Sequence, residues 1–599
     1  MALKSGRPSL ATRLGLFLLE QMFVRPDGAV RPMALAVAFR RSDGDLRQPL
    51  RKLLLRKNGA TRPILPVRLA GAIKAPWWSA WLQTYDTPPE GWPEPQGLEH
   101  PSPEKDAVVL LQIDAQTDLA FLDRLRRLLD FQTGLSPTVV PRFTGEVSDT
   151  LRRQVRSYWP AIMPGPVPER IVLLDPRTLP RLHGMRLLLD ALHDHSTAVL
   201  AFGDDMAIDR HGQLSDPWFK PVFDPLLAAQ SMLLGPMTAL RLDRLRNANA
   251  VWASLCADNA DPGDVREKIA AGLSRDDVVH CPHVVAFRFE RPVLPRKRIE
   301  PPVPDPLPHV SIIIPTRDGW DLLEPCLASL SHTDWPREKL EVIVVDNGSS
   351  DPVCLAGLER AETAGYLRVI RDPRPFNFAA LNNRAASQAQ GDLLVFLNND
   401  TLARRPDWLR VLTAFAWLPN AGAVGPKLLY GDGSVQHAGV VFGLNGRAVH
   451  VHVGLSMDAG GYQGLATMAR EVSGVTGACL AIRKGNFDSI GGFDESFPVA
   501  YNDMVLCAAL MKKGFRNIYV PDALFFHLES KTRGSLDDPQ KQLREASEAA
   551  RARALHPDLF TADPNYSPNL SLDAPYVPAV PPRRRAPWYT GSDQPPPAA

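Results

Sequence analysis

VSIIIPTRDG at residues 310–319 decides the fold, because LEVIVVDNGSSD at 340–351 and LLVFLNND at 393–400 repeat its pattern. Each stretch is an apolar run of strand length that passes directly into a short polar turn. Helical stretches near 321–331 and 378–390 separate the apolar runs, and this alternation predicts right-handed βαβ units around a parallel sheet. Open α/β folds bind ligands beyond the carboxyl ends of their strands, where successive loops converge. We therefore expect the polar turns to form a ligand site.

The composition is that of an ordinary globular protein with more than one domain. At 599 residues the chain is too long for a single core, and its 68 basic residues balance 66 acidic ones, which gives no nucleic-acid signature. The six cysteines are scattered without a C-x-x-C pair, so neither a zinc site nor a disulfide framework is predicted. No apolar run reaches the roughly 18–20 residues that a membrane span needs. These features predict a cytoplasmic protein and are compatible with a peripheral contact at the inner membrane face.

Composition shifts divide the chain into five regions. They are an N-terminal region of unknown role (1–103), a first folded unit (104–290), a Pro-rich linker (291–308), a second folded unit (309–535) and a C-terminal helix with a Pro-rich tail (536–599). The helix is predicted from Pro539 to Ala554. The basic run from Arg583 to Arg585 in the tail is interpreted as solvated and disordered, with contact to anionic lipid head groups as the alternative.

Two aspartates stand at predicted strand tips. Asp346 follows the strand near 341–345, where its carboxylate can accept hydrogen bonds from a ribose or a base, although Asp-Asn-Gly is also an ordinary turn sequence. Asp400 follows the apolar run 393–397, and a carboxylate there suits a Mg²⁺ or Mn²⁺ ion that holds a diphosphate. The alternative for Asp400 is a helix cap, because a helical run is predicted from Pro406. The leading interpretation is a nucleotide-sugar enzyme.

A set of stretches carries a resemblance to a known family. In chain order they are VSIIIPTRDG (310–319), VIVVDNGSSD (342–351), FNFAALNNRAASQAQGDLLVFLNND (376–400), GAVGPKLLY (422–430), QHAGVVFG (436–443), VTGACLAIRK (475–484), GGFDESF (491–497), HLESKTRG (527–534) and DPNYSPNLSL (563–572). The second unit thereby resembles a family 2 inverting glycosyltransferase with the GT-A nucleotide-diphospho-sugar transferase fold. It is most similar to the bacterial rhamnosyltransferase-like enzymes that build cell-surface polysaccharides.

The resemblance implies a role for each matching position. The implied donor-nucleotide contacts are Pro315, Thr316, Asp346, Asn398 and Asn399, the metal ligands are Asp400 and His527, the residues beside the sugar or acceptor are Gly477 and Ala478, and the general base is Asp503. The implied cofactor is Mn²⁺ or Mg²⁺. The implied partners are a UDP-, dTDP- or GDP-linked sugar donor and a glycan or lipid-linked glycan acceptor. The reaction would be a direct displacement with inversion, in which Asp503 takes the proton of the acceptor hydroxyl.

One stretch departs from the family's pattern and keeps another function open. Where related sequences read close to N-D-V-D-L-C-L-R, this chain has NDMVLCAA at 502–509, so Val505 replaces a second acid and Ala509 replaces an arginine. We expect Asp503 to suffice as the base. The alternative is a catalytically silent scaffold of the same fold that binds a nucleotide or a glycan. A nucleotidyltransferase lacks support, because no Gly-rich basic loop follows the first strand.

The first unit resembles the same family more faintly, through AVLAFGDDMAIDRHGQLSDPWFKPVFDPLLAAQSML at 198–233. Arg177 in LDPR (174–177) takes the place of the expected acidic cluster, where its charge would repel a cation. We therefore predict a degenerate GT-A-like domain that is retained for packing or acceptor binding. Asp204 and Asp205 support the alternative, which is a second active transferase.

Overall fold

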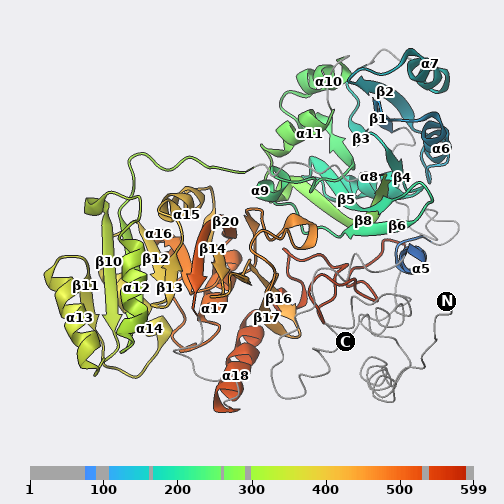
Figure 1. Cartoon of the computed structure of the whole chain (residues 1–599). Coiled ribbons are helices and arrows are strands. Elements are labelled where there is room, and N and C mark those ends of the chain that lie inside the picture. Colours follow the sequence, from blue (N-terminus) through green and yellow to red (C-terminus); the bar gives the residue numbers. More distant parts are fainter. Residues whose placement is uncertain are drawn as a thin grey trace, which may run out of the picture.

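The chain folds into two α/β units, each built on one mixed sheet (Figure 1). The computed structural model describes residues 75–88, 107–160, 166–257, 262–289, 298–528 and 539–588. The predicted α/β class is confirmed for this part of the chain. Most of the predicted N-terminal region and the start of the predicted linker lie outside the described residues. Among the helices in these ranges, none combines the length and the apolar character that crossing a bilayer requires.

The first unit has a sheet whose strands lie in a different order from the chain. Across the sheet they are β2 (Thr138–Thr144), β1 (Val108–Asp114), β3 (Arg170–Leu174), β7 (Met237–Arg241), β5 (Leu200–Ile208), β8 (Val278–Arg288) and β4 (Thr178–Pro180), and β6 (Leu214–Trp218) pairs with β5. The longer helices of this unit are α6 (Leu119–Asp130), α7 (Asp149–Tyr158), α8 (Gly184–Asp194), α10 (Ala248–Cys256) and α11 (Pro262–Ala270).

The second unit contains all the strands predicted around the polar turns. Across its sheet lie β11 (Arg368–Arg371), β10 (Leu340–Asp346), β9 (Val310–Thr316), β12 (Leu393–Leu397), β19 (Cys479–Arg483), β14 (Ala421–Leu429), β20 (Arg516–His527) and β13 (Thr401–Ala403); β15 (Val435–His437) pairs with β14 and β18 (Arg470–Glu471) with β20. The predicted parallel arrangement is confirmed for β9, β10, β11 and β12, whereas β19, for which no direction was predicted, runs antiparallel to both β12 and β14. The apolar pattern of a buried strand carries no information about the direction of its neighbour.

The longer helices of the second unit lie between its strands along the chain, and α13 (Pro352–Thr363) begins at a side-chain cap. They are α12 (Trp320–Leu330), α13 (Pro352–Thr363), α14 (Phe378–Gln388), α15 (Trp408–Ala416) and α17 (Asn502–Lys512). The Asp351 carboxylate accepts the backbone N–H groups of Val353 and Cys354, and Pro352 occupies the first helical position of α13. Between the helices, every residue of β12 is buried, which fixes the strand whose end carries Asp400.

The two sheets repeat one strand order. The order β2-β1-β3-β7-β5-β8-β4 of the first unit corresponds to β10-β9-β12-β19-β14-β20-β13 of the second. Corresponding neighbours also run in the same relative directions, parallel or antiparallel, across the whole of both series. In addition, β6 pairs with β5 as β15 pairs with β14. Among the described strands, β11 and β18 of the second sheet have no counterpart in the first.

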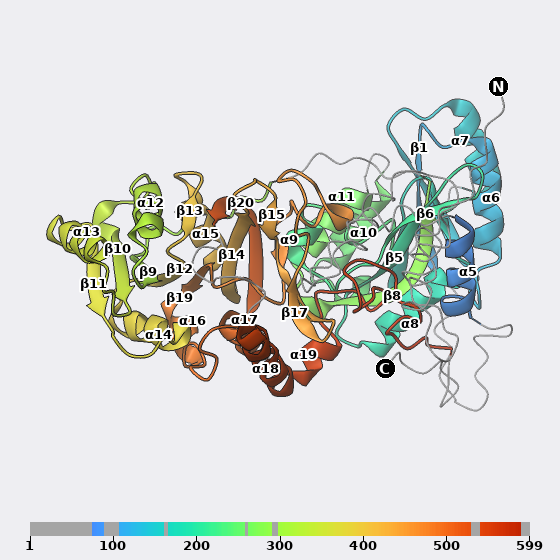
Figure 2. The same cartoon turned by 60° about the horizontal axis from the view of Figure 1, so that its bottom comes forward.

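The units and the C-terminal tail share a hydrophobic core. Trp78 of α5 (Ala75–Tyr85) packs edge-on against Phe219 of the first unit, and Tyr462 of the second unit stacks on Tyr576 of the tail. The Tyr462 hydroxyl also donates to the carbonyl of Pro217 in the first unit at 3.1 Å. Figure 2 shows the red tail passing from α19 (Pro557–Thr561) toward β5 and β8. The predicted C-terminal helix is confirmed as α18 (Pro539–Leu555).

Candidate active site

The polar turns that follow β9, β10 and β12 meet at one edge of the second sheet, as predicted. Thr316 lies opposite Asp346 in the β9–β10 pair, and the Asn347 backbone N–H donates to the Thr316 carbonyl at 2.8 Å. The Asn399 side-chain amide donates to the Thr316 hydroxyl oxygen at 3.0 Å. Pro315 is half-buried one residue before Thr316. Four of the predicted nucleotide contacts therefore come from three turns that touch one another.

Asp346 is buried and has two partners of its own. Its Oδ1 accepts the Ser349 backbone N–H at 2.9 Å, and its Oδ2 accepts from Arg371 Nη1 at 2.7 Å. The Arg371 side chain is 53% exposed, whereas that of Asp346 is 3% exposed. The Arg371 side chain therefore lies between the Asp346 carboxylate and solvent. Sequence reasoning missed Arg371, because it lies at the end of β11, away from the motif that contains Asp346.

Asp400 and His527 lie side by side, as the resemblance implied. The Asp400 Oδ1 and His527 Nε2 atoms are 3.2 Å apart, and the two side chains are almost fully buried. Backbone pairing enforces this contact, because Thr401 on β13 lies opposite His527 on β20 and the Leu528 N–H donates to the Asp400 carbonyl at 3.0 Å. The rest of the HLESKTRG stretch, from residue 529, lies outside the described residues.

The donor atoms of this pair fit a divalent cation. His527 Nδ1 faces the Gln436 side-chain oxygen at 2.8 Å, so that the ring nitrogen directed at Asp400 is the one with a lone pair. A carboxylate oxygen and an imidazole nitrogen that present lone pairs to the same space suit Mn²⁺ or Mg²⁺. Within the described ranges no group of three or more His, Cys, Asp or Glu side chains could hold a metal. The chain would supply two ligands, and water or a substrate phosphate would complete the set.

Asp503 lies in the first turn of α17, where the helix N-terminus favours a negative charge. Its Oδ2 accepts the Gly477 backbone N–H at 2.8 Å, and its Oδ1 accepts that of Met504 at 2.9 Å. A Cβ atom on Gly477 would lie 3.4 Å from the Asp503 Cβ, so the glycine permits the close approach. The next carbonyl, that of Ala478, accepts the Asn398 N–H at 3.0 Å. Asp503 is thus connected through two residues to the turn that carries Asp400.

The departure at Val505 has a packing explanation. Val505 is 6% exposed and belongs to an apolar cluster with Phe442, Phe497, Ala549 of α18 and Phe560 of α19. A carboxylate at this position would be buried among these side chains without a partner from the cluster. Ala509, one turn further along α17, is partly buried. The apolar replacement therefore accommodates the C-terminal helices.

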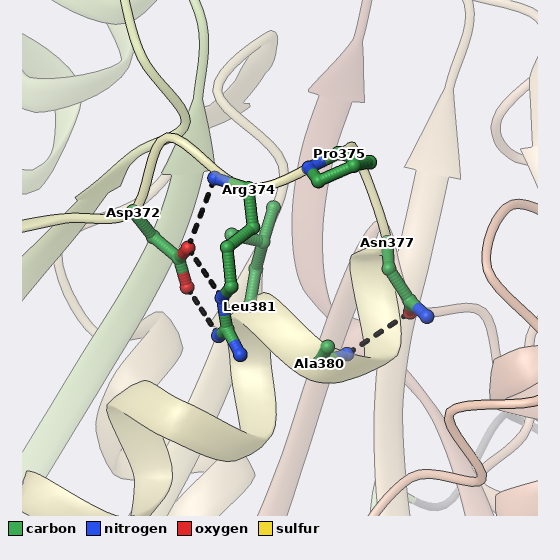
Figure 3. A pocket seen from close by; sticks show the side chains of 6 residues that line it. All are labelled: Asp372, Arg374, Pro375, Asn377, Ala380 and Leu381. Atoms are coloured by element: carbon green, nitrogen blue, oxygen red, sulfur yellow. Dashed lines mark hydrogen bonds and ion pairs between the residues drawn. The ribbon is translucent and has the colours of Figure 1, made fainter.

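A hollow of about 170 Å³ lies next to the turn that follows β10 (Figure 3). It is lined by Asp372, Arg374, Pro375, Asn377, Ala380 and Leu381. The Asp372 carboxylate pairs with Arg374 at 2.5 Å and Arg384 at 3.1 Å. The hydrogen bonds from Arg374 lower the pKa of Asp372 to about 2, so the carboxylate is charged at neutral pH. The Asp372 backbone N–H donates to the Asp346 carbonyl at 2.8 Å, which places the hollow beside Asp346.

Arginines occupy the corresponding positions of the first unit. Thr178 lies opposite Arg288 as Thr401 lies opposite His527, so Arg288 stands at the place of His527 and Arg177 at that of Asp400. Arg177 Nε is 3.2 Å from Asp114 Oδ2, and Arg288 Nε is 2.9 Å from Asp205 Oδ1. The first unit therefore has two cations at the positions where the second unit has a carboxylate and an imidazole.

Asp204 and Asp205 are already engaged by protein groups. Asp205 Oδ2 is 2.7 Å from the ammonium of Lys220, which is 0% exposed. Asp204 accepts from the Asn569 amide of the tail at 2.7 Å and lies 2.9 Å from His280 Nε2. These contacts do not favour the second active transferase that the two aspartates suggested. The identification of the first unit as a degenerate GT-A-like domain stays a prediction, which the repeated strand order supports.

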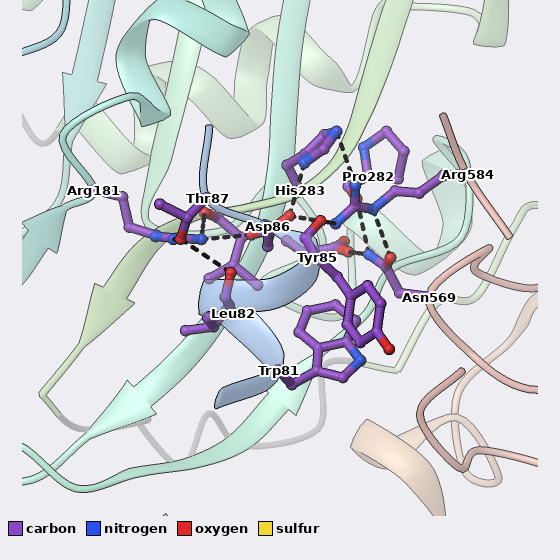
Figure 4. Close-up of polar contacts among 12 residues, drawn as sticks. Trp81, Leu82, Tyr85, Asp86, Thr87, Arg181, Pro282, His283, Asn569 and Arg584 are labelled. Carbon is purple, nitrogen blue, oxygen red and sulfur yellow. Dashed lines mark hydrogen bonds and ion pairs between the residues drawn. The ribbon is translucent and has the colours of Figure 1, made fainter. Parts of the chain in front are cut away.

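The tail is anchored at Asp86, which follows α5 and is held by Arg181 and His283 of the first unit (Figure 4). The Asp86 carboxylate is fully buried and contacts Arg181 at 2.5 Å, His283 Nδ1 at 2.7 Å and Arg584 of the tail. Arg583 donates to the carbonyls of Thr561, Ser567 and Leu570. The prediction of a solvated, disordered tail is therefore wrong for Arg583 and Arg584, although Arg585 is exposed.

Residues 311–489 match the family model described as glycosyl transferase family 2. The second unit is a family 2 glycosyltransferase domain. The match and the mixed sheet confirm the predicted GT-A type of α/β fold for this unit. The matched segment ends at residue 489, before Asp503 and His527. The positions of these two residues beside the site are known from the structure alone.

Three curated relatives are similar to parts of the chain. Protein y4gI of Sinorhizobium fredii is 41% identical over 44% of this chain and 29% of its own length. The O-antigen biosynthesis protein RfbC of Myxococcus xanthus is 32% identical over 63% of this chain and 32% of its own length. The N-acetylglucosaminyl-diphospho-decaprenol L-rhamnosyltransferase of Mycobacterium tuberculosis is 28% identical over 40% of this chain and 80% of its own length. The chain spans about a third of the length of the first two relatives.

Two solved structures are also similar. The mannosyltransferase PcManGT from Pyrobaculum calidifontis, in complex with GDP-Man and Mn²⁺, is 22% identical over 43% of this chain and 71% of its own, with a TM-score of 0.31. GalNAc-T7 with UDP, GalNAc and Mn²⁺ is 16% identical over 43% of this chain and 49% of its own, with a TM-score of 0.35. These likenesses are too remote to bear on individual residues.

Proposed function

We propose that the second unit transfers a sugar from a nucleoside-diphosphate donor to an acceptor hydroxyl, with inversion at the anomeric carbon. The observation that carries this proposal is the chain of contacts from Asp503 through Gly477 and Ala478 to Asn398, whose side-chain amide nitrogen lies 3.4 Å from His527 Nε2. A direct displacement on a glycosyl diphosphate needs a base for the attacking hydroxyl and positive charge at the leaving group. The proposed base is therefore tied to the turn that precedes the proposed metal ligand Asp400.

Asp503 acts as the general base in this proposal. The acceptor oxygen forms a bond to the anomeric carbon while its proton passes to the Asp503 carboxylate. The bond from the anomeric carbon to the phosphate oxygen breaks, and its electron pair leaves with the diphosphate. Attack opposite the leaving group inverts the configuration and requires no enzyme nucleophile. The Gly477 N–H holds the carboxylate in one orientation during the reaction.

Asp400 and His527 would hold Mn²⁺ or Mg²⁺. When bound, this ion supplies positive charge that stabilises the departing diphosphate. Thr316, Asp346 and Asn399 would contact the nucleoside. Because Asp346 is paired with the half-exposed Arg371, a ribose or base that engages Asp346 Oδ2 would displace the guanidinium.

The proposed acceptor is a growing cell-surface glycan, carried on a lipid at the inner membrane face. Two of the relatives support this choice by name, since one is an O-antigen biosynthesis protein and the other an L-rhamnosyltransferase for N-acetylglucosaminyl-diphospho-decaprenol. We propose that the first unit is a degenerate copy that supports the second by packing or binds the acceptor. A silent scaffold is not favoured, because the replacement at Val505 is accounted for by packing.

Nucleotide binding followed by donor turnover tests the proposal. The full chain is melted with UDP, dTDP and GDP in the presence of Mn²⁺, and a nucleotide at about 100 times its Kd should add about 2.7 kcal/mol to the stability. The sugar donor of the stabilising nucleotide is then assayed for Mn²⁺-dependent hydrolysis or transfer. Binding without turnover would favour the scaffold, and the absence of both would contradict the proposed function.

A further inference from the structure

The Gln436 side chain makes a two-point contact with His527. Its Oε1 lies 2.8 Å from His527 Nδ1, and its Nε2 lies 3.5 Å from the His527 carbonyl oxygen. Gln436 is 4% exposed and lies in the middle of β15, which pairs with β14 next to β20. The glutamine therefore approaches His527 from an element other than those that pair with its backbone.

The two contacts together decide which ring nitrogen carries the proton. With Oε1 toward the ring and Nε2 toward the carbonyl, the amide accepts from Nδ1–H and donates to the carbonyl oxygen. The reverse amide orientation would set two oxygens against each other at the carbonyl. In the neutral ring, this contact leaves the lone pair on Nε2, which faces Asp400 Oδ1 at 3.2 Å and the Asn398 amide nitrogen at 3.4 Å.

We propose that Gln436 is a positioning residue, which holds His527 in the tautomer and orientation that bind the divalent cation. This inference rests on the proposed metal role of Asp400 and His527. Histidines that bind metals usually donate their second N–H to an acceptor, and loss of that acceptor typically weakens metal binding about 10- to 100-fold. The signal in the sequence is QHAGVVFG, whose first residue had no assigned role.

The first unit has a comparable support at the same place. Arg288, which stands where His527 stands, donates through Nη2 to the Asp216 carbonyl at 2.9 Å and lies 3.4 Å from Asp216 Oδ2. Asp216 belongs to β6, the strand that pairs with β5 as β15 pairs with β14. In both units a residue of this additional strand fixes the side chain at the end of the long strand. The supporting residue differs in kind, because Asp216 contacts a guanidinium and Gln436 contacts an imidazole.

The affinity of the full chain for Mn²⁺ alone tests the inference without relying on activity. The EPR signal of the free ion measures how much Mn²⁺ remains unbound. Gln436→Leu removes the acceptor at similar volume and should weaken Mn²⁺ binding about 10- to 100-fold. Gln436→Glu keeps an acceptor for Nδ1–H but sets an oxygen against the His527 carbonyl, so its Mn²⁺ affinity should lie between those of Gln436→Leu and the wild type. Gln230→Leu is the matched control, because Gln230 is a buried amide that bonds to Leu226 and Ala469 far from the proposed ligands.

Coupling to His527 distinguishes positioning from general destabilisation. In a His527→Ala background, Gln436→Leu should cause no further loss of Mn²⁺ affinity. Wild-type affinity in Gln436→Leu, beside weakened binding in His527→Ala, would overturn the role of Gln436 and leave the metal site intact. Unchanged binding in both Asp400→Asn and His527→Ala would refute the metal site itself. Equal losses in Gln436→Leu and Gln230→Leu would also overturn the inference.

Discussion

The two units share a strand order but differ at the tips of their strands. In the second unit Asp400 and His527 present lone pairs to one space, whereas Arg177 and Arg288 stand at those positions in the first. The first unit neutralises its tip with buried ion pairs, of which Lys220–Asp205 is almost completely excluded from water. The comparison shows that two sheets can keep one strand order while the residues at their strand tips differ in charge and chemistry.

Replacement of the base should produce the largest effect. Asp503→Asn keeps the size of the side chain but removes the proton acceptor, so kcat for sugar transfer should fall about 10²- to 10⁴-fold. The stability should change little, because an amide oxygen can still accept the Gly477 N–H. Asp488→Asn, at a side chain 55% exposed, serves as the control. An unchanged kcat in Asp503→Asn would assign the base elsewhere.

An aspartate of the first unit should matter for stability instead. Asp205→Asn leaves the buried Lys220 and Arg288 without their shared carboxylate, and the free energy of unfolding should fall by about 3–5 kcal/mol. Asp400→Asn should cost less, because Asp400 faces one imidazole and not two buried side chains that are permanent cations or ammonium groups. Urea unfolding of both variants measures the difference. Equal decreases in the free energy of unfolding would contradict a structural role for Asp205 that Asp400 does not share.

Restoring the acid of the family pattern should be harmful in this chain. Val505→Asp places a carboxylate in the apolar contact between α17 and the C-terminal helices, and should destabilise the protein by about 2–3 kcal/mol. Val353→Asp, on a side chain that is 61% exposed, is the matched control. Thermal melting measures both. A Val505→Asp protein that is more active at unchanged stability would show that the missing acid belongs to the site.

Acid should loosen the junction between the tail and the first unit, with the smallest effect of the series. The charges of Arg584 and Arg181 and the hydrogen bond to His283 hold the pKa of Asp86 well below its usual range despite its burial. A depressed folded pKa gives stability that is complete above the unfolded value of about 3.9 and is lost as the pH falls below it. This group should cost about 1 kcal/mol between pH 6 and pH 3. Asp86→Asn should lack this part of the pH dependence, whereas Asp194→Asn, on an exposed side chain, should retain it.

The sequence predicted the strands and the residues at their ends, but it did not predict the contacts between segments that lie far apart in the chain. Apolar runs that end in polar turns located Asp346 and Asp400, because burial and turn formation are local properties. Arg371 and Gln436 escaped notice, since each meets its partner only after the sheet is assembled. Arg584 was misread, because a Pro-rich basic tail has the composition of disorder unless a buried acid such as Asp86 receives it. The direction of β19 also depends on the path of the chain, which periodicity does not encode.

The stoichiometry of nucleotide binding most directly tests the claim that only one of the two like units is functional. The full chain is titrated calorimetrically with the stabilising nucleoside diphosphate in the presence of Mn²⁺. We predict one equivalent per chain, with binding strongly weakened in Asp400→Asn and unchanged in Arg177→Ala. Two equivalents per chain, or a site that is insensitive to Asp400→Asn and lost in Arg177→Ala, would contradict the account.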